Sequence, residues 1–224
     1  MLSLIATPIG NLKDITLRSL EILKEADSII CEDTRRTGIL LSHYEIKKPL
    51  IILNDYNETK QIPYLIQKLQ QGENLALVSD AGTPLVSDPG FKLVRECLKE
   101  NIQIDSLPGP SAPITALTLS GFPPDKFMFL GYFPEKSGAR TTLLQKLKEI
   151  HQAIPTTFIF FAAPFKLRKP LEEIKDLLDD PEISLARELT KIHQEVVTKR
   201  ASEWTEYYAK KEPKGEYVLL LRLS

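Results

Sequence analysis

Short apolar runs alternate with longer amphipathic stretches through the first half of the chain. These apolar runs are residues 2–7, 28–31, 50–53, 75–78 and 102–107. Each is short enough to be a buried strand, and the stretches between them place apolar residues at helical spacing. Five strand–helix alternations predict a mostly parallel, doubly wound α/β sheet.

Several helix boundaries carry their own signals. The first helix is expected to start between Asp14 and Thr16, and either Asp33 or Thr34 is placed to cap the second. The helix after residues 50–53 is expected to run to about Gln71. After Gly90 a further helix is predicted, and its apolar face is expected to carry Phe91, Val94, Cys97 and Leu98.

The pattern changes after residues 121–125, where two adjacent prolines interrupt any helix. Strands are predicted at residues 127–132, 156–161, 183–188, 195–198 and 217–221. Helices are predicted at about residues 137–151, 171–178 and 202–209. The chain is therefore predicted to form two domains: an α/β domain over residues 1–121 and a mixed α/β domain over residues 122–224.

Polar or Pro/Gly-rich loops follow all five strands of the first half. Parallel strands would gather these loops at one edge of the sheet, where open α/β sheets bind ligands. The residues expected along this edge are Pro8, Gly10, Asp33, Asp80, Gly82 and Ser111. The loop over residues 79–90 is the longest and contains two aspartates. The alternative is an ordinary turn whose aspartates cap the next helix, and Asp88, followed by Pro-Gly, is assigned to that entry.

Composition and charge narrow the class of protein. The 224 residues are 42% hydrophobic and 26% charged with a net charge of −1, as in ordinary globular chains. The two cysteines, Cys31 and Cys97, lack a metal-ligand spacing and fit a reducing compartment. The first residues lack the basic region of a signal peptide, and no apolar run approaches the ~18 residues of a membrane span. A soluble cytoplasmic protein is expected.

Several common chemistries have no motif here. The chain has no phosphate-loop motif, no G-x-G-x-x-G after its first strand and no G-x-S-x-G. Its three histidines, His43, His151 and His193, are scattered, so no metal site is expected. A small neutral or partly cationic cofactor suits the predicted edge better than a polyphosphate.

Five segments together resemble one known family. They are residues 6–12, 32–37 (Glu-Asp-Thr-Arg-Arg-Thr), 78–90, 107–112 and 186–191. They are similar to the ribosomal RNA small-subunit methyltransferase I family, which 2′-O-methylates a cytidine of 16S rRNA and has the tetrapyrrole-methylase fold. The resemblance implies two α/β domains with S-adenosylmethionine in the cleft between them, a homodimer, and 16S rRNA or the 30S subunit as partner.

The resemblance also implies a set of site residues. The implied cofactor contacts are Pro8, Asp80, Ala81, Gly82, Thr83, Pro84, Ser111, Ala112, Ala186 and Arg187. Residues 32–37 lie where the substrate would approach, and Arg35 and Arg36 are hypothesised to bind its phosphates. The alternative for both arginines is a solvated helix surface.

A ribose hydroxyl is a weak nucleophile, so a base should help the transfer. Glu32, Asp33 and Asp80 are the candidates, and Asp33 is selected as the catalytic residue. The alternative for Asp33 is a helix cap or an ion-pair partner of Arg35.

The chain departs from the family in two places. The family has an aromatic residue, Glu, Ser or Ala, Pro, His and Arg in its second domain, whereas residues 161–166 read Phe-Ala-Ala-Pro-Phe-Lys. Many members also carry a further C-terminal segment. Two other functions stay open: methylation of a tetrapyrrole-like small molecule, which the near-neutral charge supports, and a divergent paralogue that binds the cofactor without acting on rRNA, which the altered segment supports.

Overall fold

The computed structural model describes residues 1–223. It divides into two compact units, Met1–Ser111 and Ala112–Ser224. The boundary lies ten residues before the predicted one, because α5 (Ala112–Ser120) belongs to the second unit. This helix buries Ala116 and Leu117 and contacts four strands of the second sheet. The proline pair therefore follows the first helix of the second unit and does not separate the units.

The first unit contains a fully parallel sheet, as predicted. Its strands are β1 (Leu2–Ile5), β2 (Ser28–Cys31), β3 (Leu50–Ile52), β4 (Leu75–Val78) and β5 (Ile104–Leu107). They lie in the order β3-β2-β4-β1-β5, and every pairing is parallel. All residues of β1, β2 and β4 are buried, which explains why these strands read as unbroken apolar runs.

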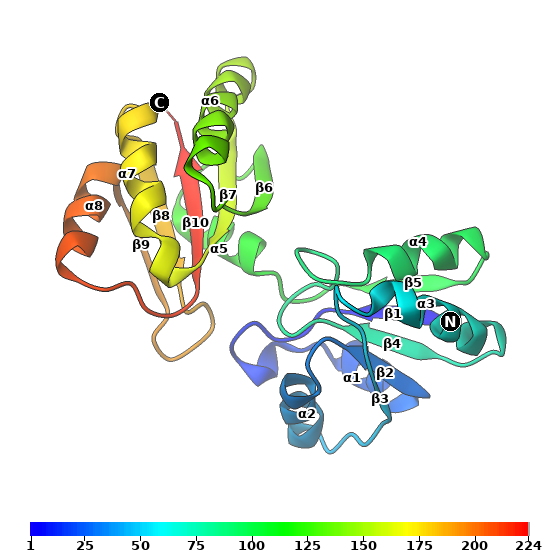
Figure 1. The fold of residues 1–224 in the computed structure, drawn as a ribbon. Coiled ribbons are helices and arrows are strands. Elements are labelled where there is room, and N and C mark those ends of the chain that lie inside the picture. Colours follow the sequence, from blue (N-terminus) through cyan, green and yellow to red (C-terminus); the bar gives the residue numbers. More distant parts are fainter. Residues whose placement is uncertain (224) are drawn as a thin grey trace. The chain divides into compact units, whose positions relative to one another are not determined.

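Helices cover both faces of this sheet (Figure 1). They are α1 (Leu17–Glu25), α2 (Thr34–His43), α3 (Glu58–Gln70) and α4 (Phe91–Lys99), with a short 3-10 helix η1 (Leu12–Asp14) before α1. Successive residues of a strand point to opposite faces. Accordingly Ile29 packs in the same cluster as side chains of α1 and α2, whereas Ile30 packs with side chains of α3 and α4. The unit is doubly wound.

Two predicted helix starts are confirmed, and one predicted helix face is correct for two of its four residues. Thr16 caps α1 and Asp33 caps α2, each accepting a backbone N–H with its side-chain oxygen. The buried residues of α4 are Leu93 and Cys97, and Val94 is partly buried beside them. The expected face included Phe91 and Leu98, which are 64% and 65% exposed. Cys97 and Val94 therefore lie on the inner face as predicted, and Leu93, one turn before Cys97, faces the core in place of Phe91 and Leu98.

The second unit contains a mixed sheet. Its strands are β6 (Phe127–Tyr132), β7 (Thr157–Ala162), β8 (Glu182–Arg187), β9 (Glu195–Arg200) and β10 (Tyr217–Arg222). The order is β6-β7-β10-β8-β9, and within the described part of this second sheet only the β6–β7 pair is parallel. The five predicted strands match these within about two residues, inside the usual uncertainty of helix and strand ends.

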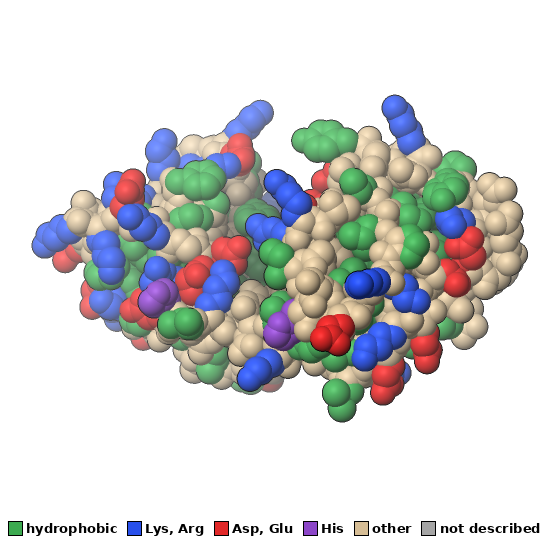
Figure 2. Space-filling model, turned by 90° about the horizontal axis from the view of Figure 1, so that it is seen from below, with side chains coloured by type: hydrophobic (Ala, Val, Ile, Leu, Met, Phe, Trp, Pro, Cys, Tyr) green, Lys and Arg blue, Asp and Glu red, His purple; other side chains and the backbone are tan. Residues whose placement is uncertain are grey.

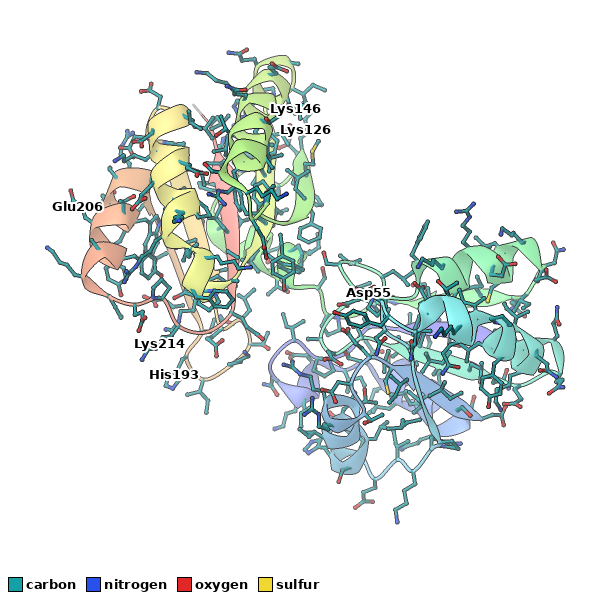
Figure 3. All side chains as sticks on the ribbon, in the orientation of Figure 1. Asp55, Lys126, Lys146, His193, Glu206 and Lys214 are labelled. Carbon is teal, nitrogen blue, oxygen red and sulfur yellow. The ribbon has the colours of Figure 1, made fainter. Side chains whose placement is uncertain are left out.

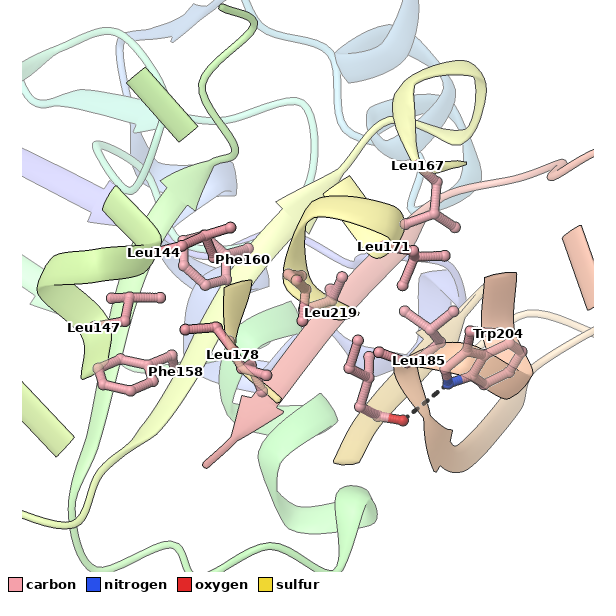
Figure 4. Close-up of a cluster of buried hydrophobic side chains, with 14 of the residues drawn as sticks. Leu144, Leu147, Phe158, Phe160, Leu167, Leu171, Leu178, Leu185, Trp204 and Leu219 are labelled. Atoms are coloured by element: carbon pink, nitrogen blue, oxygen red, sulfur yellow. Dashed lines mark hydrogen bonds between the residues drawn. The ribbon is translucent and has the colours of Figure 1, made fainter. Parts of the chain in front are cut away.

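One large apolar core holds the second unit together. The other elements are α6 (Ser137–Ala153), a 3-10 helix η2 (Pro164–Lys166), α7 (Arg168–Leu177) and α8 (Ala201–Lys210). Leu144, Phe160, Leu171 and Trp204 pack in this core (Figure 4). The indole Nε1 of Trp204 donates to the carbonyl of Ile183 at 2.9 Å, so the one polar atom of this side chain is satisfied.

The surface mixes charges of both signs. Figure 2 shows Lys and Arg side chains interspersed with Asp and Glu over the face it displays. This agrees with the net charge of −1. Among the helices that the structure describes, none has the length and apolar character needed to cross a bilayer.

Candidate functional site

The loops that follow the parallel strands share the carboxyl edge of the first sheet. β2 and β4 are neighbours in this sheet, but the chain leaves them in opposite directions, toward β3 and toward β5. Such a switch point is where open α/β sheets bind ligands. Asp33 follows β2 and Asp80 follows β4, so both flank this point, and Asp55 follows the neighbouring β3 (Figure 3).

Hydrogen bonds tie the loop after β4 to the loop after β1. Thr7 and Gly82 exchange two backbone hydrogen bonds of 2.9 and 3.0 Å. The Thr7 hydroxyl donates to the carbonyl of Ser79 at 3.0 Å, and the Ser79 hydroxyl donates to the carbonyl of Gly82 at 2.9 Å. Thr7 and Ser79 are both buried. The two loops therefore form one ordered unit, which we call the rim.

The loop after β5 joins the same rim. The Thr83 hydroxyl donates to the carbonyl of Pro110 at 3.1 Å. A Cβ atom on Gly109 would lie 2.8 Å from the Cβ of Ala6, which is too close for any larger residue. Gly82 has a φ of +89°, a conformation that favours glycine. Small residues are thus required for three strand ends to approach one another.

A carboxylate from α3 holds the far end of the long loop. Glu58 is only 4% exposed, and its Oε1 accepts the backbone N–H groups of Gly90 at 3.1 Å and Lys92 at 3.0 Å. These are N-terminal donors of α4. The sequence left open the alternative that the loop's own aspartates cap the next helix. That alternative is wrong, because Glu58, more than thirty positions earlier, accepts these N–H groups, and the role of Asp88 in shaping the helix entry stays a prediction.

The loop after β2 contacts the rim through Asp80. The backbone N–H of Asp33 donates to Asp80 Oδ1 at 3.2 Å, and Arg36 Nε lies 3.4 Å from Asp80 Oδ2. The Arg35 side chain donates two hydrogen bonds to Asp33, from Nε to Oδ1 at 3.0 Å and from a terminal nitrogen to Oδ2 at 2.6 Å. These hydrogen bonds lower the pKa of Asp33 to about 2.

Two nearby carboxyl groups, Glu32 and Asp88, have raised pKa values. Burial, followed by the charges of Asp80 and Asp55, raises the pKa of Glu32. Burial, followed by the charges of Glu32 and Asp80, raises the pKa of Asp88 to about 6, against a hydrogen bond with Ser79. The rim is therefore an acidic surface. The sequence does not show that these carboxylates raise one another's pKa, because the effect depends on contacts between loops that are far apart in the chain.

The structure brings most of the predicted site residues of the first unit to the rim. Pro8 follows Thr7, and Ala81, Gly82, Thr83 and Pro84 form the middle of the long loop, with Ala81 exposed. Gly10 follows β1 in the same loop. Ser111 closes the first unit, and Ala112 opens α5 of the second.

Besides Ala112, two predicted residues belong to the second unit, and both lie at the end of β8. Ala186 is buried in the sheet, whereas Arg187 is partly exposed. Arg187 Nε donates to the carbonyl of Lys214 at 2.6 Å, and a terminal nitrogen lies 3.8 Å from Glu195. A Cβ atom on Gly215 would lie 2.8 Å from a carboxylate oxygen of Glu188, so this turn packs tightly.

Sequence reasoning missed the residues that hold the rim together: Thr7, Ser79 and Glu58. Each is polar and buried, and the side chain of each makes a hydrogen bond to a backbone group in a loop that follows β4. A polar residue directly after an apolar strand was the available signal for Thr7 and Ser79. Glu58 had no such signal, because it reads as an ordinary first-turn residue of α3. Among residues 1–223, no three His, Cys, Asp or Glu side chains are grouped so as to hold a metal ion.

Comparison with known proteins places this chain in a class. The family model of the Tetrapyrrole (Corrin/Porphyrin) Methylases matches residues 1–205. A crystal structure of diphthine synthase superimposes with a TM-score of 0.78 at 14% identity, covering 99% of this chain and 89% of that one. The methyltransferase CobJ gives 0.73 at 17% identity, covering 100% and 94%. The class is that of the tetrapyrrole methylases.

Relatives of higher identity define the family more narrowly. Ribosomal RNA small subunit methyltransferase I of Thermotoga maritima is 45% identical over 98% of this chain and 97% of its own length. The protein of the same name from Escherichia coli O157:H7 is 44% identical over 98% of this chain and 77% of its own length. This chain therefore belongs to the ribosomal RNA small subunit methyltransferase I family.

Proposed function

We propose that this protein transfers a methyl group from S-adenosylmethionine to ribosomal RNA of the small subunit, at the ribose 2′-oxygen of a cytidine in 16S rRNA. The observation that carries the proposal is the rim. It is an acidic, small-residue edge at a switch point, in a chain 45% identical to a protein named for rRNA methylation.

The rim suits this cofactor chemically. S-adenosylmethionine supplies an electrophilic methyl group on a positively charged sulfonium, and it carries an ammonium but no phosphate. Carboxylates at the edge favour a cation, and the tight approach of Gly82 and Gly109 offers backbone groups where a side chain would block them. We propose Pro8, Asp80, Ala81, Gly82, Thr83, Pro84 and Ser111 as its contacts in the first unit, and Ala112, Ala186 and Arg187 as its contacts in the second.

The chemistry asks little of the protein beyond positioning. A displacement at a methyl carbon needs the acceptor oxygen held in line, which the bonded loops of the rim support. Loss of the hydroxyl proton needs a base near the acceptor. Asp33 stays the sequence-based prediction for this base, but its pair with Arg35 lowers its basicity. We therefore propose Glu32, whose pKa is raised, as the proton acceptor.

Arg35 and Arg36 are proposed to contact substrate phosphates. Both are exposed at the start of α2. Arg35 donates hydrogen bonds from Nε and one terminal nitrogen to the Asp33 carboxylate. These two hydrogen bonds fix the direction of its guanidinium group. Arg36 pairs with Asp80 through one longer contact, with Nε 3.4 Å from Oδ2. We further propose, from the family, that the protein is a cytoplasmic homodimer.

Cofactor binding can be measured without any RNA. Isothermal titration of the full chain with S-adenosylmethionine should give binding that Asp80→Ala weakens at least tenfold. Asp105→Ala is the matched control, since Asp105 lies in β5 of the same sheet and pairs only weakly with Arg18 at 3.7 Å. Equal affinity of the Asp80 variant and the wild type would remove Asp80 from the cofactor contacts.

The acceptor atom can be identified by its chemistry. Methylation at the ribose 2′-oxygen blocks alkaline cleavage of the adjacent phosphodiester, whereas methylation of a base does not. RNA methylated by the protein should therefore contain one alkali-resistant dinucleotide with a methylated cytidine. A methyl group that is released on a free base after hydrolysis contradicts the 2′-O assignment and leaves the cofactor assignment intact.

A further inference from the structure

Two exposed aromatic side chains follow neighbouring strands of the second unit. Tyr132 ends β6 and is 61% exposed, and Phe165 lies in η2 after β7 and is 78% exposed. β6 and β7 are parallel, so both strands end at the same edge of the sheet. The ring of Tyr132 packs against that of Phe161 with centroids 5.3 Å apart.

Lysine and arginine residues lie in the same two chain segments as these rings. The ammonium of Lys166 lies 5.5 Å from the centroid of the Phe165 ring and pairs with Glu135. Lys136, Arg168 and Lys169 are exposed in the same two segments. Residues 132–136 and 161–169 thus carry four cations and one carboxylate. We call Tyr132, Phe165, Lys136 and Lys166 the aromatic–lysine surface.

A buried arginine fixes the segment that carries half of this surface. Arg140 is 6% exposed and donates to the carbonyls of Pro134 at 3.1 Å and Glu135 at 2.6 Å. The same guanidinium makes hydrogen bonds of 2.6 and 2.7 Å to Glu173 of α7. The segment between β6 and α6 is therefore held in place before any ligand arrives, which lowers the entropic cost of binding.

We propose that the aromatic–lysine surface binds unpaired nucleotides of an RNA substrate. A base stacks on an exposed ring, and the lysines neutralise phosphates, which is how proteins hold single-stranded nucleic acid. A protein partner fits less well, because lysine is depleted in protein–protein interfaces. The inference deepens the proposed function and rests on it for the identity of the substrate, but the surface belongs to the second unit and uses none of the rim residues.

The test uses the full chain and a fluorescein-labelled, ten-nucleotide single-stranded RNA, with affinity measured by anisotropy. Phe165→Ala should weaken binding at least fivefold, because one base stack is worth about 5- to 150-fold in affinity. Phe165→Tyr should retain it. Lys166→Ala should lower the slope of log affinity against log salt by about one. Thermal melts should match the wild type, since both side chains are exposed.

The chain offers a matched control in the other unit. Tyr64 of α3 is also an exposed aromatic residue with a lysine ammonium 5.5 Å from its ring centroid. Tyr64→Ala should leave RNA affinity unchanged. Equal losses in Tyr64→Ala and Phe165→Ala, or no loss in Phe165→Ala and Tyr132→Ala, overturn the inference. A wild-type protein that does not bind the RNA also overturns it and favours a protein partner.

Methyl transfer to 30S subunits, measured on the same proteins, separates this inference from the proposed function. If the wild type methylates rRNA and Phe165→Ala leaves the KM for subunits unchanged, only the inference fails. If the wild type transfers no methyl group but Phe165→Ala still loses affinity for the RNA, the inference stands and the proposed function fails. A raised KM for subunits in Phe165→Ala, with unchanged cofactor affinity, supports both.

Discussion

Glu32 and Asp33 are neighbours in the chain, yet their surroundings drive their acidities apart. Asp33 caps α2 and accepts two N–H groups of the Arg35 side chain, which lowers its pKa to about 2. Burial and the charges of Asp80 and Asp55 raise the pKa of Glu32. Two adjacent carboxyl groups with divergent pKa values can take different roles in one site.

The first residue-scale prediction separates these roles by kinetics. Glu32→Gln should lower kcat for rRNA methylation about 100-fold, the usual loss when a general base is removed, with unchanged cofactor affinity. Asp33→Asn should have the smaller effect on kcat. Single-turnover rates with saturating subunits measure both. A larger kcat loss in Asp33→Asn than in Glu32→Gln would return the base to Asp33.

The second residue-scale prediction concerns stability against pH. The folded state raises the pKa of Asp88 from 3.8 to about 6, so it binds this proton more tightly than the unfolded chain does. The contribution of Asp88 to stability should therefore be lost as pH rises from about 4 to about 7. Asp88→Asn, which stays neutral, should match the wild type near pH 4 and exceed it at pH 8 by about 1–2 kcal/mol, which is the roughly 3 kcal/mol of a shift of two pKa units reduced for solvent screening of this partly exposed group. Urea unfolding across this range measures the difference. A constant difference at all pH values contradicts the assignment.

At the scale of elements, the strands and most helix ends were predictable because local signals set them. Buried parallel strands appear in the sequence as apolar runs. Thr16 and Asp33 are residue types that cap helix N-termini, and they mark the starts of α1 and α2. The start of α4 after Gly90 was predicted, but its cap was not, because the capping residue Glu58 belongs to another helix. The edge on which Asp33, Asp80 and Gly82 lie followed from parallel topology. The hydrogen bonds that join Thr7, Ser79 and Gly82 depend on contacts between segments far apart in the chain.

The element-scale prediction removes this distant cap. Glu58→Ala leaves the buried N–H of Gly90 and that of Lys92 without their acceptor and should cost about 2–3 kcal/mol of unfolding free energy. Glu58→Gln keeps an acceptor oxygen and should cost less. Glu25→Ala, an exposed change at the end of α1, is the control and should be nearly neutral. Equal stability of Glu58→Ala and Glu25→Ala would show that the cap contributes little.

At the scale of the whole molecule, the chain is two α/β units of similar length with different sheets. The first carries a parallel sheet whose carboxyl edge gathers the rim, and the second a mixed sheet whose parallel pair ends in the aromatic–lysine surface. The segment Phe-Ala-Ala-Pro-Phe-Lys at residues 161–166 forms part of that surface. The boundary between units was misplaced, because α5 packs by its apolar side chains, which no local signal assigns to one sheet or the other.

The whole-molecule prediction is the assembly state. A homodimer should give a mass in solution of twice the 25.4 kDa of one chain, measured by light scattering after size exclusion. A stable dimer needs about 800 Å² of buried surface per partner, so the mass should hold on dilution to micromolar concentration. A single-chain mass at every concentration contradicts the proposed dimer.

The central claim is methyl transfer to small-subunit rRNA, and one measurement tests it most directly. The full chain is incubated with methyl-labelled S-adenosylmethionine and 30S subunits from a strain lacking the homologous enzyme, and the label is counted in purified 16S rRNA. We expect label in the rRNA, on one cytidine ribose, and none with subunits already methylated by that enzyme. Unlabelled rRNA from a protein that binds the cofactor would contradict the account and would favour a small-molecule acceptor or a chain that has lost activity.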